Sequence, residues 1–326
     1  MKALRRKDLI SIFDLAKEEI EGILSLAATL KDKFRKNISY TPLAGKTLAM
    51  IFEKPSLRTR VTFEAGMTQL GGHAIFLGPS DINIGVRETA ADVAHNLERW
   101  VDGIMARTFS HQTVVDLARE ASIPVINGLT DRLHPCQVLS DCFTLQEKLG
   151  SLAGRKVAFL GDGNNVAHSW IYASARLGIN FSIACPRGYE PLPEIVREAS
   201  AEATSNICVT HDIAEALSDA DAVYTDVWAS MGQENEAEKR RTVFAPFQLN
   251  SAALALARPQ ALVMHCLPAH RGEEIIDEVL DGPQSIVFDQ AENRLHCQKA
   301  ILTALMANTK RKGKGERRKA KGQVSG

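Results

Sequence analysis

The sequence predicts an α/β protein made of two doubly wound domains with mainly parallel sheets, joined by interdomain helices. Short apolar segments typical of buried strands alternate with segments whose apolar residues recur every three or four positions, as on a helix. The length of 326 residues fits two domains. A content of 45% hydrophobic and 24% charged residues is that of a globular protein with enough apolar material for a core.

The predicted elements follow one another in a regular order. A first helix is expected after Asp14, its predicted N-cap, because apolar residues from Ile20 to Leu30 have helical spacing. Strands are expected at residues 47–52, 73–77, 103–107, 124–127, 156–160, 180–184, 222–226, 261–266 and 285–288, with helical segments between most of them. A helix over 136–149 that ends at Gly150 separates the strands into two sheets of four or five.

This break near residue 150 divides the chain. We expect a first domain over residues 1–147, a second over 148–290, and a C-terminal helix over 291–309 that packs back on the first domain. Residues 310–326 hold eight Lys and Arg against one Glu, so this tail carries about +7 and the rest of the chain about −7. Its composition predicts disorder. A solvated tail without a partner is favoured over an arm that binds nucleic acid or a membrane.

Composition indicates a cytoplasmic protein. No apolar stretch approaches the ~18 residues of a membrane helix, and no apolar segment follows the basic amino terminus, as it would in a secretory signal. The cysteines form no Cys-x-x-Cys pair and lie in apolar surroundings, which predicts reduced thiols and no zinc site. They are Cys136, Cys142, Cys185, Cys208, Cys266 and Cys297.

The most informative segment is residues 54–60 (KPSLRTR), which lies between an expected strand and an expected helix. Backbone N–H groups, the helix dipole and two guanidiniums meet at such a helix N-terminus, so the segment predicts a phosphate site. A solvated basic turn that caps the helix is the alternative, because Ser and Thr are ordinary N-cap residues.

Polar residues also follow several other expected strands. In open α/β sheets, ligands gather at the carboxyl ends of the strands. Five such strand ends therefore predict a cleft shared by the two domains. They are Arg107 and the segments 134–137 (HPCQ), 161–165 (GDGNN), 226–232 (DVWASMG) and 265–268 (HCLP).

The segment 161–165 imitates a dinucleotide-binding fingerprint. Such a site needs glycine where Val166 stands and an acidic residue about 20 positions later. The next expected strand, 180–184, is instead followed by Cys185 and Pro186, so no acidic residue stands there. A nicotinamide-linked dehydrogenase is therefore a disfavoured alternative.

Four segments together resemble the aspartate/ornithine carbamoyltransferase family: 56–60, 134–137, 226–232 and 265–268. The last two are similar to its ornithine-specific members in particular. The similarity runs from about residue 9 to residue 307, with the motifs in the family's order and spacing. It implies transfer of a carbamoyl group from carbamoyl phosphate to the side-chain amine of ornithine, giving citrulline and phosphate in arginine biosynthesis. It implies neither a metal nor an organic cofactor.

The resemblance also implies which residues bind carbamoyl phosphate, most of them in the first domain. The phosphate would contact the 56–59 turn, and Arg107 and His134 would polarise the carbamoyl oxygen. Gln137 would accept from the carbamoyl NH₂, with Arg294 nearby. The full set is Ser56, Leu57, Arg58, Thr59, Asn83, Arg107, His134, Gln137, Cys266, Leu267 and Arg294. Leu57 and Asn83 stand where the family often has Thr and Gln.

The second domain would bind ornithine. Asn165, Ser230 and Met231 would hold the α-amino and α-carboxylate groups, while Asp226 and Cys266 would face the side-chain amine. A carboxylate at 226 suits a cationic acceptor and would repel aspartate. The implied catalytic residues are thus Arg107, His134, Asp226 and Cys266. A cis Leu267-Pro268 bond is also expected from the family.

The family implies a homotrimer, or a multiple of trimers, whose active sites lie between subunits; Asn83 would reach a neighbour's site. Three other functions stay open besides the dehydrogenase. Two are the same chemistry on N-acetylornithine or on putrescine, and the third is a non-catalytic protein that binds nucleic acid through its basic tail.

Overall fold

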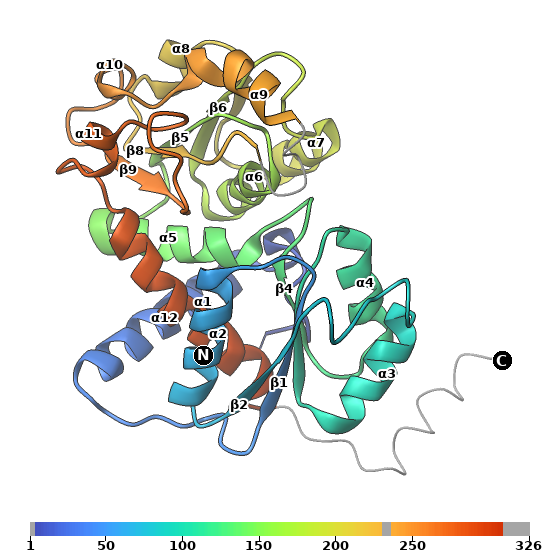
Figure 1. The fold of residues 1–326 in the computed structure, drawn as a ribbon. Coiled ribbons are helices and arrows are strands. Elements are labelled where there is room, and N and C mark those ends of the chain that lie inside the picture. Colours follow the sequence, from blue (N-terminus) through green and yellow to red (C-terminus); the bar gives the residue numbers. More distant parts are fainter. Residues whose placement is uncertain (1–3, 230–235, 309–326) are drawn as a thin grey trace.

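The structure is a computed structural model that describes residues 4–229 and 236–308. Figure 1 shows two lobes, each built around a parallel sheet, with α5 and α12 at the junction between them. The first sheet has the order β2(His73–Leu77), β1(Thr47–Phe52), β3(Gly103–Arg107), β4(Val125–Leu129). The second has the order β7(Ile207–Thr210), β6(Asn180–Ala184), β5(Lys156–Leu160), β8(Ala222–Thr225), β9(Leu262–His265). The predicted α/β fold with two mainly parallel sheets is confirmed.

Each sheet has one point where the strand order reverses. In the first sheet this point lies between β1 and β3, and in the second between β5 and β8. Neighbouring strands there are followed by loops that leave toward opposite faces of the sheet, which opens a crevice at their carboxyl ends. The loops after these four strands begin at residues 53, 108, 161 and 226. They include most of the polar segments that the sequence singled out.

Helices cover both sheets. The first lobe contains η1(Ile12–Asp14), α1(Lys17–Arg35), α2(Leu57–Gln69), α3(Ala90–Trp100), α4(His111–Glu120) and α5(Pro135–Leu149). The second contains α6(Asn165–Leu177), α7(Pro193–Glu202), α8(Ile213–Leu217), α9(Ala237–Phe244), η3(Ala245–Phe247), α10(Ser251–Leu254) and α11(Asp277–Leu280). The last helix, α12(Val287–Met306), packs against α1, α2 and α5. Since α5 and α12 lie among other elements, both are buried along most of their length.

Side-chain caps explain where several helices begin. Ser56, Thr89, Ser110, Asn164 and Asp212 each precede a helix and accept a hydrogen bond from an N–H group of its first turn. These bonds satisfy donors that have no partner inside the helix. Because three of these caps follow β1, β3 and β5, they also fix the position at which the chain leaves the sheet.

Several element boundaries differ from the sequence prediction. The strand predicted at 285–288 is wrong: Ser285 makes only an isolated bridge with Val263, and α12 begins at Val287. The apolar start of a buried helix has the same pattern as a short strand. The strand β7 was missed because its four residues are all only half-buried. Asp14 does not cap α1: it lies in η1, and Glu19 Oε2 instead accepts from Ala16 N at 2.9 Å.

None of the helices in the described ranges combines the length and apolar character that crossing a bilayer requires. The six cysteines are all free, and four of them are buried.

The glycine at position 163 is explained by packing. An added Cβ would lie 2.2 Å from Pro191 N and 2.4 Å from Glu190 C, both backbone atoms that cannot move aside cheaply. Gly163 N also donates to Tyr189 O at 2.9 Å. The Gly-rich loop after β5 therefore needs this glycine in order to contact the segment before α7.

We predict that Gly163→Ala lowers the free energy of unfolding by about 2 kcal/mol or more, because the loop must move away from residues 189–191. Chemical denaturation monitored by circular dichroism measures the change. Gly188→Ala is the control: its φ is 85° but nothing lies within 4 Å of an added Cβ, so its cost is about 1 kcal/mol. Equal stability of Gly163→Ala and the wild type would contradict the packing argument.

Candidate active site

The N-terminus of α2 presents one arginine to the junction between the lobes. Ser56 caps the helix, and its Oγ accepts from Thr59 N at 3.3 Å. Arg60 points elsewhere, since it pairs with Glu64 at 3.0 Å and its guanidinium lies 3.8 Å from the centre of the Phe76 ring. Burial lowers the pKa of Arg58, and the nearby Arg294 lowers it too, whereas Cys266 and Asp226 of the second lobe act in the opposite direction. Arg58 therefore faces residues of the second lobe.

Arg294 joins three helices at this point. It comes from α12, is buried, and donates from Nη2 to Thr59 Oγ1 of α2 at 3.3 Å. Its Nη1 donates to Gln137 Oε1 of α5. The turn 56–59 and Gln137, which are far apart in the sequence, are thus held next to each other by one guanidinium.

Arg107 and His134 come from the ends of β3 and β4. Burial lowers the pKa of Arg107 to about 10, and the nearby Arg294 and Arg58 lower it too. His134 immediately precedes α5, and its backbone N donates to Ser169 Oγ of α6 at 2.8 Å. Burial, followed by Arg294, Arg107 and Arg58, holds the pKa of His134 well below its usual value. The imidazole is therefore neutral at pH 7, while the guanidiniums stay charged.

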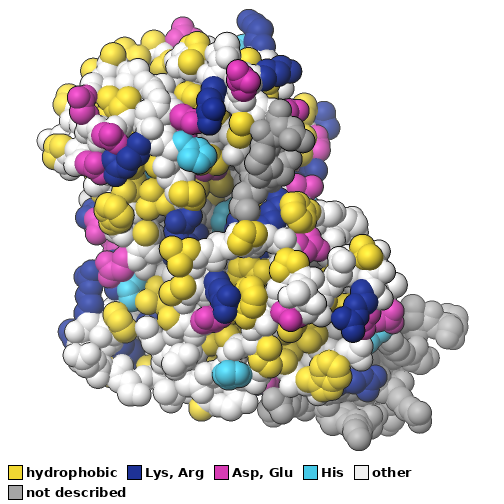
Figure 2. Space-filling model, viewed as in Figure 1, with side chains coloured by type: hydrophobic (Ala, Val, Ile, Leu, Met, Phe, Trp, Pro, Cys, Tyr) yellow, Lys and Arg dark blue, Asp and Glu magenta, His cyan; other side chains and the backbone are white. Residues whose placement is uncertain are grey.

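This group of Arg58, Arg107, Arg294 and His134 can bind a compact anion and its attached carbonyl. Arg294 lowers the pKa of both Arg58 and Arg107, so the three cations lie close together and create a strongly positive potential in a buried setting. The neutral imidazole can still donate one hydrogen bond, because it keeps one N–H. Figure 2 shows basic side chains at the waist between the two lobes.

Asp226 and Cys266 form the opposite side of the site. Asp226 follows β8, and its Oδ1 accepts from the Cys266 thiol at 3.0 Å and from Val227 N at 2.8 Å. Its Oδ2 accepts from Asn164 Nδ2 at 2.9 Å. Burial, and then the carboxylate of Asp226, raises the pKa of Cys266 well above its usual value. Cys266 is thus a neutral thiol that donates to a carboxylate.

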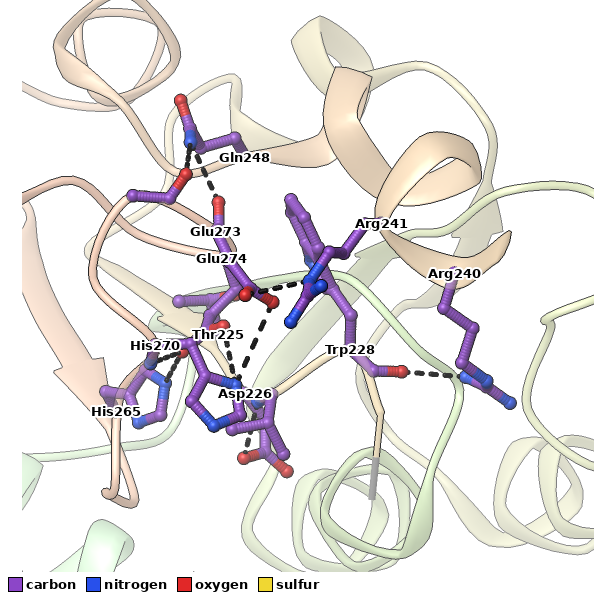
Figure 3. Close-up of polar contacts among 12 residues, drawn as sticks. Thr225, Asp226, Trp228, Arg240, Arg241, Gln248, His265, His270, Glu273 and Glu274 are labelled. Carbon is purple, nitrogen blue, oxygen red and sulfur yellow. Dashed lines mark hydrogen bonds and ion pairs between the residues drawn. The ribbon is translucent and has the colours of Figure 1, made fainter. Parts of the chain in front are cut away.

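The loop after β9 is held by a buried histidine. His265 Nδ1 accepts from Leu267 N at 2.8 Å, so Nε2 carries the proton and donates to Glu274 Oε1 at 3.0 Å (Figure 3). Glu274 also accepts from His270 N at 2.6 Å. The Leu267-Pro268 bond is cis, which confirms the expectation from the family. These bonds fix the backbone on both sides of Cys266.

The loop after β8 is anchored by Arg240. Its Nη1 donates to Trp228 O at 2.8 Å (Figure 3). The same nitrogen donates to Asp162 Oδ2 at 3.0 Å. Burial raises the pKa of Asp162 to about 6, against the lowering effect of Arg240. Ser230 and Met231, which the resemblance assigns to the acceptor, lie outside the described residues.

The structure does not bring every predicted residue into this cluster. Asn165 Nδ2 donates to Thr130 O at 2.6 Å, across the two lobes. Asn83 lies on an exposed turn between β2 and α3. Leu57 is the first residue of α2, and 73% of its surface is exposed. The predicted residues that do come together are Ser56, Arg58, Thr59, Arg107, His134, Gln137, Asp226, Cys266, Leu267 and Arg294.

Sequence reasoning missed four polar residues that support the cluster. Asn164 binds Asp226, and Gln290 accepts from His265 N at 3.0 Å. Gln290 also donates to Asp141 Oδ1 at 2.8 Å and to the Tyr224 hydroxyl at 3.1 Å. Two of them had a local signal: Asn164 lies in the segment 161–165 that the sequence singled out, and Asp141 lies one helical turn after Gln137.

Two groups of described side chains have metal-ligand spacing. Asp226, His265 and Cys266 offer ligand atoms within 4.8 Å of one another, and so do His270, Glu273 and Glu274. In the first group, both ring nitrogens of His265 are already hydrogen-bonded and Cys266 is a thiol. A metal ligand would have to be a thiolate and a free imidazole nitrogen, so the first group does not fit a resident metal.

Comparison with known proteins gives the same family for both halves of the chain. The model "Aspartate/ornithine carbamoyltransferase, carbamoyl-P binding domain" matches residues 7–147, and the model "Aspartate/ornithine carbamoyltransferase, Asp/Orn binding domain" matches residues 153–305. An ornithine carbamoyltransferase of Anoxybacillus flavithermus is 55% identical over 306 residues, which cover 93% of this chain and 98% of that protein. The anabolic ornithine carbamoyltransferase of Pyrococcus furiosus is 50% identical and covers 94% of this chain and 99% of its own length.

Solved structures agree. The ornithine carbamoyltransferase structure from Pyrococcus furiosus superposes with a TM-score of 0.92 at 50% identity, covering 95% of this chain and all of that one. The structure from Thermus thermophilus gives a TM-score of 0.83 at 48% identity, covering 92% and 99%. With both domain models matched in order and near-complete overlap with these relatives, the chain belongs to the aspartate/ornithine carbamoyltransferase family.

Proposed function

We propose that this protein is an ornithine carbamoyltransferase, which transfers the carbamoyl group of carbamoyl phosphate to the side-chain amine of L-ornithine. The observation that carries the proposal is a buried Asp226–Cys266 pair next to three guanidiniums. The guanidinium group suits a doubly charged phosphate, and the carboxylate suits a cationic acceptor. Relatives at 50% identity or more bear this name, one of them described as anabolic, which supports a role in arginine biosynthesis.

In this proposal carbamoyl phosphate lies at the N-terminus of α2. The backbone and side chains of residues 56–59 bind the phosphate, where the helix dipole and Arg58 favour negative charge. Arg107 and the neutral His134 donate to the carbamoyl oxygen, and Gln137 accepts from its NH₂. Arg294 is supported in the same site by its bonds to Thr59 and Gln137. Leu267 and, from a neighbouring subunit, Asn83 complete the donor site.

Ornithine then lies toward the second lobe. Asp226 and Cys266 orient its side-chain amine, while Asn165, Ser230 and Met231 bind the α-amino and α-carboxylate groups. The amine must lose its proton before it attacks, because an ammonium group has no lone pair. Attack forms the N–C bond and an oxyanion that Arg107 and His134 stabilise. Collapse then breaks the bond from carbon to the phosphate oxygen, and the phosphate leaves with the electron pair and takes the proton that the attacking nitrogen loses.

In this proposal each lobe binds one of the two substrates. Residues 1–147 bind carbamoyl phosphate and residues 148–290 bind ornithine, while the C-terminal helix α12 returns Arg294 to the donor site. We also propose a cytoplasmic homotrimer, or a multiple of trimers, with active sites between subunits. The chemistry of the residues described needs no organic cofactor, because both the leaving group and the nucleophile come from the substrates.

We predict that the protein forms a ureido product from carbamoyl phosphate with ornithine, and none with aspartate, because Asp226 repels a second carboxylate. The assay offers ornithine, N-acetylornithine, putrescine and aspartate in parallel and measures the ureido product. Turnover of aspartate alone would overturn the role of Asp226. A preference for putrescine or N-acetylornithine would replace the proposed acceptor but keep the donor chemistry.

Asp226→Asn should lower kcat/KM for ornithine about 30-fold or more, because a buried charge loses its partner. Inhibition by inorganic phosphate should be unchanged, since phosphate binds at the far side of the site. The control is Asp212→Asn, where the side chain caps α8 and Asn caps equally well. Unchanged ornithine kinetics in Asp226→Asn would show that this carboxylate does not bind the acceptor.

The pH profile provides a further prediction. Ornithine's amine should have a pKa near ~10.4, so its nucleophilic fraction rises with pH. His134 and Cys266 do not titrate between pH 6 and 9, because their pKa values are shifted below and above this range. Steady-state kcat/KM for ornithine should therefore rise through this range and fall near pH 10, where Arg107 loses its proton. A flat profile from pH 6 to 9 would be inconsistent with attack by the free amine.

A further inference from the structure

A fully buried carboxylate lies directly behind the donor site. Asp141 is on α5, one turn after Gln137, and its side chain has no solvent exposure. Burial raises the pKa of Asp141 to about 7, although hydrogen bonds from Gln137, Gln290 and Tyr224 oppose the shift. A carboxylate in such a place costs stability. None of the roles described so far uses it.

Asp141 accepts a hydrogen bond from the residue that faces the carbamoyl group. Gln137 Nε2 donates to Asp141 Oδ1 at 2.8 Å, and Gln137 Oε1 accepts from Arg294 Nη1. An amide has a donor end and an acceptor end of nearly the same shape, so packing alone does not choose between its two orientations. An ionised carboxylate, which is the main form of Asp141 above its pKa of about 7, does choose, because it can only accept. The reversed amide would place two oxygens against each other.

The same oxygen orients a second amide. Gln290 Nε2 of α12 donates to Asp141 Oδ1 at 2.8 Å, and Gln290 Oε1 accepts from His265 N at 3.0 Å. His265 directly precedes Cys266. One carboxylate oxygen therefore sets the orientation of an amide on the donor side and of an amide that supports the acceptor side.

We propose that Asp141 is a positioning residue, whose Oδ1 fixes the orientation of two side-chain amides. The oxygen of Gln137 then faces Arg294 and the carbamoyl site, and the oxygen of Gln290 faces His265 N. This inference rests on the proposed carbamoyl transfer. Asp141 itself touches no substrate. It acts through Gln137, whose Oε1 has a second lone pair left for the carbamoyl NH₂ while the first accepts from Arg294.

The test compares Asp141→Asn with wild type. Asn has the same shape but can donate as well as accept, so it no longer enforces one orientation of Gln137. Saturation kinetics with carbamoyl phosphate at high ornithine should show a loss of kcat of about 10- to 100-fold, as small misplacements of reacting groups produce. The Ki of inorganic phosphate should stay close to the wild-type value, because in the proposed function the phosphate is bound by the 56–59 turn and not by Gln137.

A double-mutant cycle separates positioning from general damage. If Asp141 acts through Gln137, the combined variant Gln137→Ala/Asp141→Asn should be about as active as Gln137→Ala alone, within roughly threefold. The matched control is Asp102→Asn, a buried carboxylate in the same lobe that accepts from Thr47 N at 2.9 Å at the amino end of the sheet. This variant removes a charge far from the carboxyl ends of the strands and should keep the wild-type kcat.

Three results would overturn the inference: an unchanged kcat in Asp141→Asn, a full additive loss in the double variant, or a parallel weakening of phosphate inhibition. A second variant, Asp141→Ser, has a hydroxyl too short to reach both amides and should show the same pattern if Asp141→Asn fails to fold. Failure of the wild type itself to make a ureido product would instead refute the proposed function, so the two failures are distinguishable.

Discussion

The close placement of Arg58, Arg107 and Arg294 is the constraint on which this site depends. Three like charges repel one another, and burial adds to the cost of holding them. The lowered pKa of Arg58 and of Arg107 records this cost. The fold holds the charges there because each arginine comes from a different rigid element: the start of α2, the end of β3 and the interior of α12. A bound dianion would relieve the repulsion among the three guanidiniums.

The second lobe supplies the opposite charge without cancelling the first. Asp226 satisfies its oxygens with Cys266, Val227 and Asn164 rather than with an arginine. A direct ion pair with Arg58 would close the site on itself and leave neither charge for a ligand. The neutral Cys266 thiol therefore gives Asp226 a hydrogen-bond partner that carries no charge.

Much of this arrangement could be predicted from sequence, for physical reasons. Segments 47–52 and 103–107 are continuous apolar runs because both faces of their sheet are covered, and their ends had to carry the ligand-binding loops. The strand β7 lacked this signal, since apolar and polar residues alternate only weakly in a half-buried edge strand. The start of α12 was mistaken for a strand because a short apolar run has no distinctive period.

The supporting residues were harder to predict because their partners are remote. Gln290 and Asp141 are 149 positions apart, and nothing local in either segment indicates that α12 crosses α5. The bond between Arg294 and Thr59 spans 235 positions. Residue types within one motif can be recognised from their spacing, whereas contacts between motifs require the packing of whole helices.

The hydrogen bond from Asn165 to Thr130 has a further consequence. It joins the start of α6 in one lobe to the loop after β4 in the other. A ligand that takes the Asn165 amide must first replace this internal bond, so it gains only the difference between two hydrogen bonds. At the same time it releases a tie between the lobes. Binding of such a ligand would therefore be linked to the freedom of the two lobes to move relative to each other, because the Asn165 amide is one of the ties between them.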